Sequence, residues 1–190
     1  MRHILLVLVL LLLNGWHVYG QFRLPERFVQ LLESAGLEFF QPLEGRYVVQ
    51  SYLKNELLAA DFIMRSRREK LEIRFNVFPE DPTTAADDFP HIRALQMASH
   101  IASNDDDSVI TALSLGDEDL GVDRFNADWG KLYYFRPKMG FSTRSHCQML
   151  VLHKESLGTV FVFYLFDEAS PAIDNRLLSL AFLNSNGSGQ

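Results

Sequence analysis

The residues that could support covalent chemistry include one cysteine, Cys147, and two nearby histidines, His146 and His153. A cysteine nucleophile needs a histidine base within hydrogen-bond distance. In the strand predicted for residues 146–153, Cys147 and His153 share a face but lie about 20 Å apart, at ~3.3 Å per residue. His146 points to the opposite face. The spacing therefore predicts no thiol–histidine pair, and it predicts that Cys147 is a buried, unreactive thiol.

A serine nucleophile is suggested by Ser51 and Lys54, which match the Ser-x-x-Lys pattern of penicillin-recognising enzymes. That chemistry requires the serine at a helix start and the lysine one turn later. Here the pattern falls in a predicted strand, and the sequence has no Ser-Asp-Asn or Lys-Thr-Gly companion. It also has no Gly-x-Ser-x-Gly elbow, P-loop or His-Glu-x-x-His motif. The sequence therefore predicts no catalytic residue.

Acidic residues in the segment 116–128 partly fit a calcium-binding loop. Asp117, Asp119, Asp123 and Asp128 fall at positions one, three, seven and twelve of the loop. Position six requires glycine and holds Val122, and position twelve normally provides a bidentate glutamate. The preferred interpretation is a solvated acidic loop, with a weak Ca²⁺ site as the alternative. The histidines show no zinc-ligand spacing, and no metal or cofactor is predicted.

Basic residues gather around the tip of one predicted hairpin: Arg65, Arg67, Arg68, Lys70 and Arg74. Such a cluster could dock an acidic partner or an anionic ligand. Glu69 and Glu72 are interleaved with these residues, which favours a solvated sheet surface as the alternative. We keep Arg65, Arg67 and Arg68 as candidate partner-binding residues.

The stretch Asp128, Trp129 and Gly130 is predicted to form a structural turn into the strand that begins at Lys131. Gly130 can adopt a positive φ, Asp128 can accept free backbone N–H groups, and Trp129 can cover the end of the sheet. In the alternative interpretation, Trp129 and Tyr133 stand in a groove and contact a partner.

The elements that position these residues follow from hydrophobic periodicity. Apolar residues at helical spacing predict a helix over residues 24–35, with Gly36 after its end. Short aromatic-rich strands are predicted at 37–43 and 46–53. Residues 70–78 alternate strictly between apolar and polar side chains, which predicts a half-buried strand that pairs with 60–66 in a hairpin. A helix follows, capped by Asp87 or Asp88, with Pro90 in its first turn.

The remaining third of the chain is predicted to be mostly sheet. Strands are expected at 109–115, 131–135, 146–153 and 159–166, and the last of these is apolar from Val160 to Phe166, as in a central strand covered on both faces. A final helix is predicted from Pro171, with Ile173, Leu177, Leu180 and Ala181 facing inward. This order of elements predicts the α+β class, an antiparallel β-sheet sandwiched by helices.

The first twenty residues have the parts of a cleavable signal peptide. Arg2 is basic, residues 4–13 are apolar, and Val18-Tyr19-Gly20 resembles a cleavage site. Ten apolar residues are too few to span a bilayer, which takes about twenty. Residues 21–183 should form one domain, followed by a flexible polar tail at 184–190. We therefore expect a secreted or periplasmic protein without stable membrane insertion.

Charge and cysteine content limit the partners further. Removing residues 1–20 leaves 17 basic and 24 acidic side chains, a net charge of −7. Such a balance argues against nucleic acid as a partner. A single cysteine excludes an intramolecular disulfide, and we expect a monomer stabilised by its core alone.

The stretch from Phe125 to Gly130, followed by a strand and by Leu152-His153-Lys154, resembles exported bacterial proteins of unassigned function with a PsbP-like fold. That fold is an antiparallel sheet sandwiched by helices, and it is shared with a photosystem II extrinsic subunit and a nuclear-import Ran-binding factor. The resemblance covers residues 24–183 in element order. It implies a non-catalytic module that binds a protein partner, and it carries over no catalytic residue.

The leading functional prediction is therefore a secreted or periplasmic interaction module. The first alternative is a carrier of a small apolar ligand, because the chain has more Phe and Tyr than its strands require: 15 Phe and 6 Tyr. The second alternative is a hydrolase.

Overall fold

The computed structural model describes residues 22–50, 57–81 and 89–184. Several sequence predictions fall outside these residues. They are the signal peptide, the Ser51–Lys54 pattern, the caps at Asp87 and Asp88, and all of the polar tail except Asn184.

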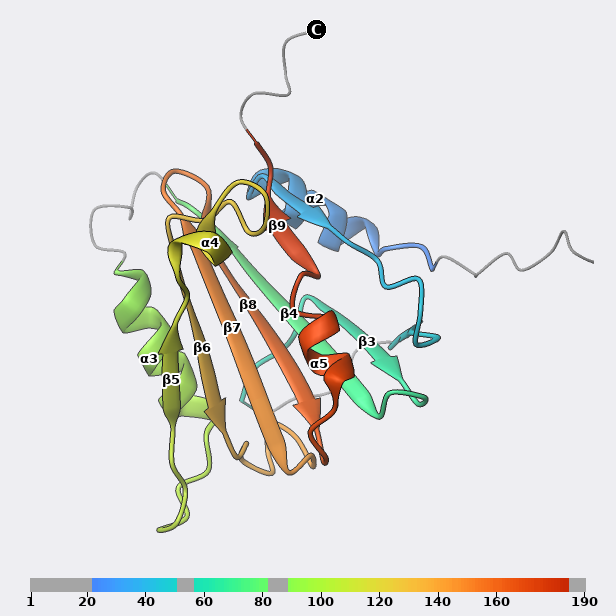
Figure 1. Cartoon of the computed structure of the whole chain (residues 1–190), viewed down its shortest axis with the longest axis vertical. Coiled ribbons are helices and arrows are strands. Elements are labelled where there is room, and N and C mark those ends of the chain that lie inside the picture. The colour runs from blue at the N-terminus through green and yellow to red at the C-terminus, as the bar shows by residue number, and fades with distance from the viewer. Residues whose placement is uncertain (1–21, 51–56, 82–88, 185–190) are drawn as a thin grey trace, which may run out of the picture.

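The described chain forms two antiparallel sheets and short helices (Figure 1). The helices are α2 (Glu26–Ser34), α3 (Pro90–Ile101), α4 (Asp117–Leu120) and α5 (Pro171–Asn175). The strands are β1 (Leu37–Phe39), β2 (Val48–Val49), β3 (Phe62–Ser66), β4 (Leu71–Pro79), β5 (Thr111–Ser114), β6 (Trp129–Phe135), β7 (His146–Lys154), β8 (Gly158–Phe166) and β9 (Leu180–Phe182). The larger sheet has the order β2-β3-β4-β8-β7-β6-β5, and β1 pairs with β9. The predicted α+β class with a large antiparallel sheet is confirmed.

The turn between β7 and β8 shows how local sequence sets the register of the central strands. Ser156 and Gly158 both have positive φ, at 63° and 127°. A Cβ on Gly158 would lie 2.3 Å from the backbone oxygen of Phe78, so only glycine fits at this position. The turn aligns Lys154 with Gly158 and brings Phe161 opposite Val151 in two of the nine-residue strands.

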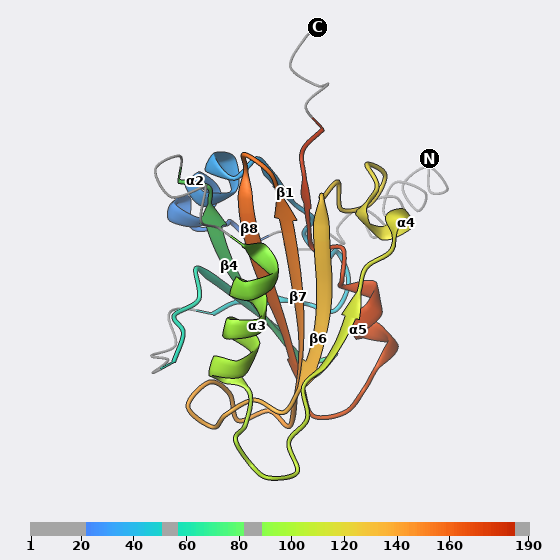
Figure 2. The ribbon, with the colours of Figure 1, turned by 90° about the vertical axis from the view of Figure 1, so that its left-hand side faces the viewer.

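Each face of the large sheet is covered by a different layer, and Figure 2 shows α3 and α5 on opposite sides of the sheet. On the α2 side, helix α2, helix α5 and the β1–β9 pair pack over Phe75, Val162 and Leu150. On the α3 side, helix α3 packs over Met149, Phe161 and Tyr133. Side chains from β8 are buried on both faces, as the apolar run 160–166 predicted.

The end of the chain differs from the prediction. The final helix ends at Asn175, and Leu180–Phe182 forms a strand that pairs with β1, with Leu37 opposite Phe182. A helix extended to Ala181 would have left β1 without its hydrogen-bonding partner, whereas the strand buries all three of its residues. Long-range pairing therefore overrides the local helical spacing of Leu177 and Leu180.

The polar face of β4 also differs from the prediction. Glu72, Arg74 and Asn76 were expected in solvent, yet they are 6%, 5% and 4% exposed. Arg74 donates to the carbonyl oxygen of Phe141, and Asn76 donates to that of Ala59, both at 2.7 Å. Residues from connecting segments therefore cover the face that alternation alone assigned to water.

Within the described part of the chain, no helix is both long and apolar enough to cross a membrane.

Candidate functional site

The two aromatic residues predicted to share a groove, Trp129 and Tyr133, differ in how far they are buried. Trp129 begins β6 opposite His153, and its ring packs half-buried against the α3-side core. Tyr133 lies on the same face but is only 3% exposed, and burial raises the pKa of its phenol. Tyr133 is therefore a core residue, and of the two rings Trp129 alone has appreciable surface for a partner.

The contacts of Asp128 and Gly130 at this turn agree only in part with those predicted. Gly130 does not have a positive φ. Glycine is needed there because neighbouring side chains leave no room for a Cβ, which would lie 2.7 Å from Leu115 Cδ1 and 3.1 Å from Leu152 Cδ2. Asp128 does accept a backbone N–H, that of Glu155 at 2.8 Å. Asp128 therefore ties the start of β6 to the β7–β8 turn.

Asn126 is the residue that supplies the left-handed backbone at this turn, with φ 49°. Its amide nitrogen donates to the carbonyl oxygens of Phe182 and Leu183, at 3.0 and 2.8 Å. Lys154 Nζ donates to the Asn126 carbonyl at 2.8 Å. Asparagine tolerates this conformation better than most residues, which is the signal that sequence analysis could have used.

The structure divides the basic cluster around the β3–β4 hairpin. Arg65 lies in β3 between Val48 and Glu72 and faces the α3 side. Arg67 and Arg68 lie on the exposed turn that follows β3. Arg74 is buried in β4 and pairs with Glu72. The five basic residues therefore do not form one surface, and Arg65 lies on the sheet rather than on the turn.

Strand β5 is the most open element of the large sheet. It ends the strand order and pairs with β6 alone, and all four of its residues are exposed. Leu115 N–H donates to Gly130 on the β6 side, so by alternation the N–H and C=O groups of Ala112 and Ser114 point away from β6. These groups form an edge to which another strand can add.

Exposed apolar side chains accompany this edge on the α2 side. Leu113 is 58% exposed, and Val109, just before the strand, is 70% exposed. Tyr134, opposite Thr111 in β6, is 38% exposed. We call Val109, Leu113, Tyr134 and strand β5 the edge surface. It contains no lysine or proline of the kind that natural proteins use to block an edge.

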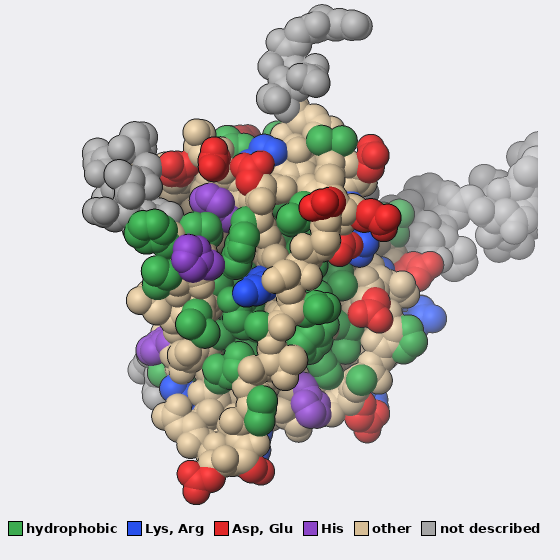
Figure 3. Space-filling model, turned by 60° about the vertical axis from the view of Figure 1, so that its left-hand side comes forward, with side chains coloured by type: hydrophobic (Ala, Val, Ile, Leu, Met, Phe, Trp, Pro, Cys, Tyr) green, Lys and Arg blue, Asp and Glu red, His purple; other side chains and the backbone are tan. Residues whose placement is uncertain are grey.

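Carboxylates lie at both ends of the edge surface. Asp105, Asp106 and Asp107 precede it in the chain, and Asp117 and Glu118 follow it in the first turn of α4. Figure 3 shows hydrophobic side chains on this side of the molecule, with groups of acidic side chains above and below them. The surface is therefore apolar at its centre and negative at its ends.

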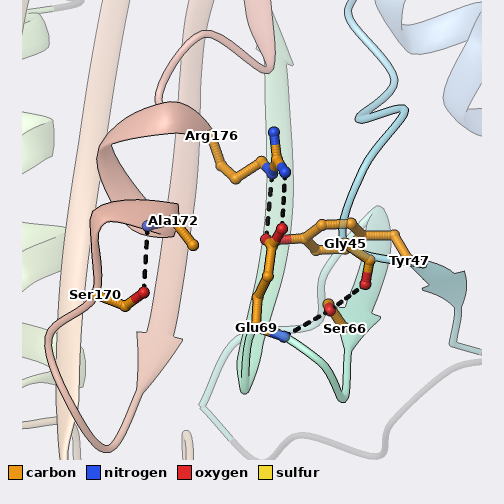
Figure 4. Close-up of polar contacts among 7 residues, drawn as sticks. All are labelled: Gly45, Tyr47, Ser66, Glu69, Ser170, Ala172 and Arg176. Carbon is orange, nitrogen blue, oxygen red and sulfur yellow. Dashed lines mark hydrogen bonds and ion pairs between the residues drawn. The ribbon is translucent and has the colours of Figure 1, made fainter.

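A polar cluster of Tyr47, Glu69 and Arg176, which sequence analysis missed, joins three segments that lie far apart in the sequence (Figure 4). Arg176, after α5, donates to Glu69 through Nη2 at 2.7 Å and through Nε at 3.2 Å. The Tyr47 hydroxyl donates to Glu69 Oε2 at 2.5 Å. The side chains of Arg176 and Glu69 are each 13% exposed. The cluster links the β3–β4 turn to α5 and to the segment before β2, so its role is structural.

Glu69 should make folding stability sensitive to acid. Burial by itself would raise the pKa of Glu69, but hydrogen bonds from Arg176 and Tyr47 outweigh it and hold the pKa below the ordinary value of 4.5. A lowered pKa in the folded state gives stability that is present above about pH 4.5 and is lost as the pH falls through the folded value. Urea unfolding of the wild type and of Glu69→Gln measures the free energy of unfolding at each pH. Between about pH 5 and 3, where carboxyl groups titrate, the wild type should lose more stability than the variant. Equal losses would contradict it.

Of the groups considered for catalysis, Cys147 and His153 in β7 are buried or hydrogen-bonded, His146 is exposed, and Ser51 and Lys54 lie outside the described residues. Cys147 is fully buried, which raises the pKa of its thiol. His153 contacts the Thr159 hydroxyl at 3.0 Å, but Thr159 is 1% exposed and out of reach of a substrate. Among the described residues, no three His, Cys, Asp or Glu side chains are grouped as metal ligands. In the acidic segment 116–128, for which a weak Ca²⁺ site was the alternative interpretation, Asp119 pairs with Arg124 at 2.5 Å.

The many phenylalanines pack against one another on the α2 side. The rings of Phe28 and Phe62 stack with their centroids 4.7 Å apart, and Phe39 and Phe75 meet both of them at 5.6 to 6.1 Å. These four rings therefore form part of the core between α2 and the sheet.

No family model, curated protein or solved structure matches this chain.

Proposed function

We propose that this chain is an exported, non-catalytic binding protein that holds an extended segment of a protein partner against the edge of β5. The observation that carries the proposal is the edge itself: β5 has one free side, and its residues are exposed throughout. A segment added there forms backbone hydrogen bonds with Ala112 and Ser114 and extends the sheet by one strand. Export is inferred from the signal-like pattern of residues 1–20.

The surroundings of the edge specify the chemistry of the segment. Alternate side chains of an added strand would lie beside Leu113, with Tyr134 one strand further in across Thr111, so they should be apolar, and contacts of this kind supply affinity. The carboxylates at both ends of the edge surface favour lysine or arginine before and after the apolar part. The partner segment is therefore an extended, alternating apolar sequence flanked by basic residues. Trp129 lies on the α3 side of β6 and could contact the same partner beyond the end of β5.

The first test is selection of peptides from a random library on the immobilised protein. We expect enriched sequences with alternating apolar residues and flanking Lys or Arg. In an ¹⁵N-labelled sample, the selected peptide should shift the amide resonances of Ala112 and Ser114. The proposal fails if binding peptides shift only resonances remote from β5.

Replacing Leu113 by glutamate should weaken binding of a selected peptide at least about tenfold, which corresponds to about 1.4 kcal/mol. The change removes an apolar contact and adds a negative charge beside the apolar part of the segment. Leu43→Glu is the matched control, because Leu43 is 64% exposed and lies outside the edge surface. Fluorescence anisotropy measures both variants. Equal affinity in Leu113→Glu and the wild type would contradict binding at this edge.

A further inference from the structure

A polar hollow of about 480 Å³ lies near the opposite edge of the large sheet from β5, on the α3 side of β3 and β4. Its walls are formed by the loop at residues 139–144 and by Gln50, Arg65, Glu72, Arg74 and Asp167. The volume lies within the range of small-ligand sites, roughly 300–1,000 Å³. Arg144 of the loop is the third guanidinium in the lining.

Two of the three arginines in the hollow are neutralised by carboxylates. Arg74 donates to Glu72 Oε1 through Nε at 2.8 Å and through Nη2 at 2.7 Å. Arg144 Nη1 lies 2.5 Å from Asp167 Oδ2. Arg74 also packs over the ring of Phe141, with its Cζ 4.8 Å from the centroid. These contacts hold both guanidiniums in place.

Arg65 is the exception. Within residues 22–50, 57–81 and 89–184, it has no carboxylate partner, and its buried Nε–H donates to no acceptor. Gln50 projects from the neighbouring segment, where its N–H donates to Ile63 in the strand that holds Arg65. The buried Oε1 of Gln50 likewise receives no hydrogen bond from the described residues. Among the described residues that line it, the hollow therefore has one arginine without a carboxylate partner, one buried N–H without an acceptor and one buried oxygen without a donor.

We infer that the hollow binds a carboxylate whose carrier also has a nearby N–H or O–H donor. The carboxylate pairs with Arg65, since a guanidinium and a carboxylate form short, charge-assisted hydrogen bonds. The donor group satisfies Gln50 Oε1. Three arginines against two acidic side chains leave the lining with one net positive charge, which a monoanion neutralises and a phosphate dianion exceeds. This site is separate from the edge surface and does not depend on the function proposed there.

The test uses N-acetylglycine, which has one carboxylate and one amide N–H, and N-acetylglycinamide, which lacks the carboxylate. Each is titrated into ¹⁵N-labelled protein at constant ionic strength while the Arg65 Nε–H resonance is observed. We expect a saturable shift with the acid and at least about tenfold weaker binding of the amide, the size of effect expected for one good charge-assisted contact. The same titration with inorganic phosphate should give weaker binding than the acid.

Two variants assign the effect to Arg65. Arg65→Gln should abolish saturable binding of N-acetylglycine, whereas Arg23→Gln, at an exposed arginine outside the hollow, should retain it. A longer acid, N-acetyltetraglycine, distinguishes the source of the carboxylate. If it binds more tightly than N-acetylglycine, the natural carboxylate is a peptide C-terminus. If it binds equally or more weakly, the natural carboxylate belongs to a small free acid.

The inference is overturned if acid and amide act alike on the wild type, or if phosphate binds more tightly than the acid. The comparison of acid with amide uses the wild type alone, so it remains decisive even if Arg65→Gln fails to fold.

Discussion

Replacing Glu72 by alanine should destabilise the protein by about 3–5 kcal/mol, because it leaves the guanidinium of Arg74 buried without its carboxylate. The side chains of Arg74 and Glu72 are 6% and 8% exposed, so solvent replaces the missing partner only to a small extent. Urea unfolding at neutral pH measures the change. A loss below about 1 kcal/mol would place this pair among surface salt bridges, contrary to its burial.

A double variant serves as the control for this prediction. In Glu72→Leu combined with Arg74→Met, both charges are removed together, and no buried ion remains. Replacing a whole buried ion pair with apolar side chains is often neutral or stabilising. The double variant should therefore recover most of the stability lost in Glu72→Ala. If it is no more stable than the single variant, the cost comes from packing at Glu72 and not from the unpaired charge.

Replacing Phe75 by alanine should cost about 3–5 kcal/mol, the usual range for a large aromatic side chain in a core. Phe75 is 0% exposed in the centre of β4. Its ring centroid lies 5.6 Å from that of Phe62 and 5.9 Å from that of Phe28, so its removal opens a cavity between α2 and the sheet. The midpoint of urea unfolding should fall, and far-ultraviolet circular dichroism should still show the folded sheet in the absence of urea.

Phe40→Ala is the matched control for the aromatic core. Phe40 follows β1 and is 38% exposed, so its ring already contacts water and leaves no closed cavity when it is removed. We expect a loss of about 1 kcal/mol or less. Similar losses in the two variants would contradict the position of Phe75 in the core and the register of β4.

The strands that follow hydrophobic alternation or continuous apolar runs were predictable from sequence. Residues 70–78 and 159–166 contain their own signals, because period-two alternation and the seven-residue apolar run at 160–166 each match one backbone conformation. The turn at Gly158 adds a residue that tolerates positive φ. The predicted hairpins β3–β4 and β7–β8 are confirmed at nearly the predicted boundaries.

The candidate sites were only partly predictable. The sequence predicts Arg65 as a candidate partner-binding residue in a turn cluster, whereas the structure places it in the lining of a hollow that includes Arg144. Arg144 is far from Arg65 in the sequence, and no local pattern connects them. Asp128 does accept a backbone N–H, whereas the positive φ predicted for Gly130 belongs to Asn126. Composition identifies residue types that suit a turn, but the close approach of Leu115 to Gly130 depends on packing.

The sequence by itself determined the class of the fold and the faces of its main strands, because helix and strand periodicities arise from backbone geometry within a few residues. Only the tertiary structure decided what covers each face. The polar side of β4 is buried because the segments that contain Ala59 and Phe141 lie over it. The strand at Leu180–Phe182 exists because β1 supplies its hydrogen-bonding partner. Among the described residues, the open edge of β5 and the buried Arg65 Nε–H that lacks an acceptor are likewise defined by which neighbours are present, and those neighbours come from distant parts of the chain.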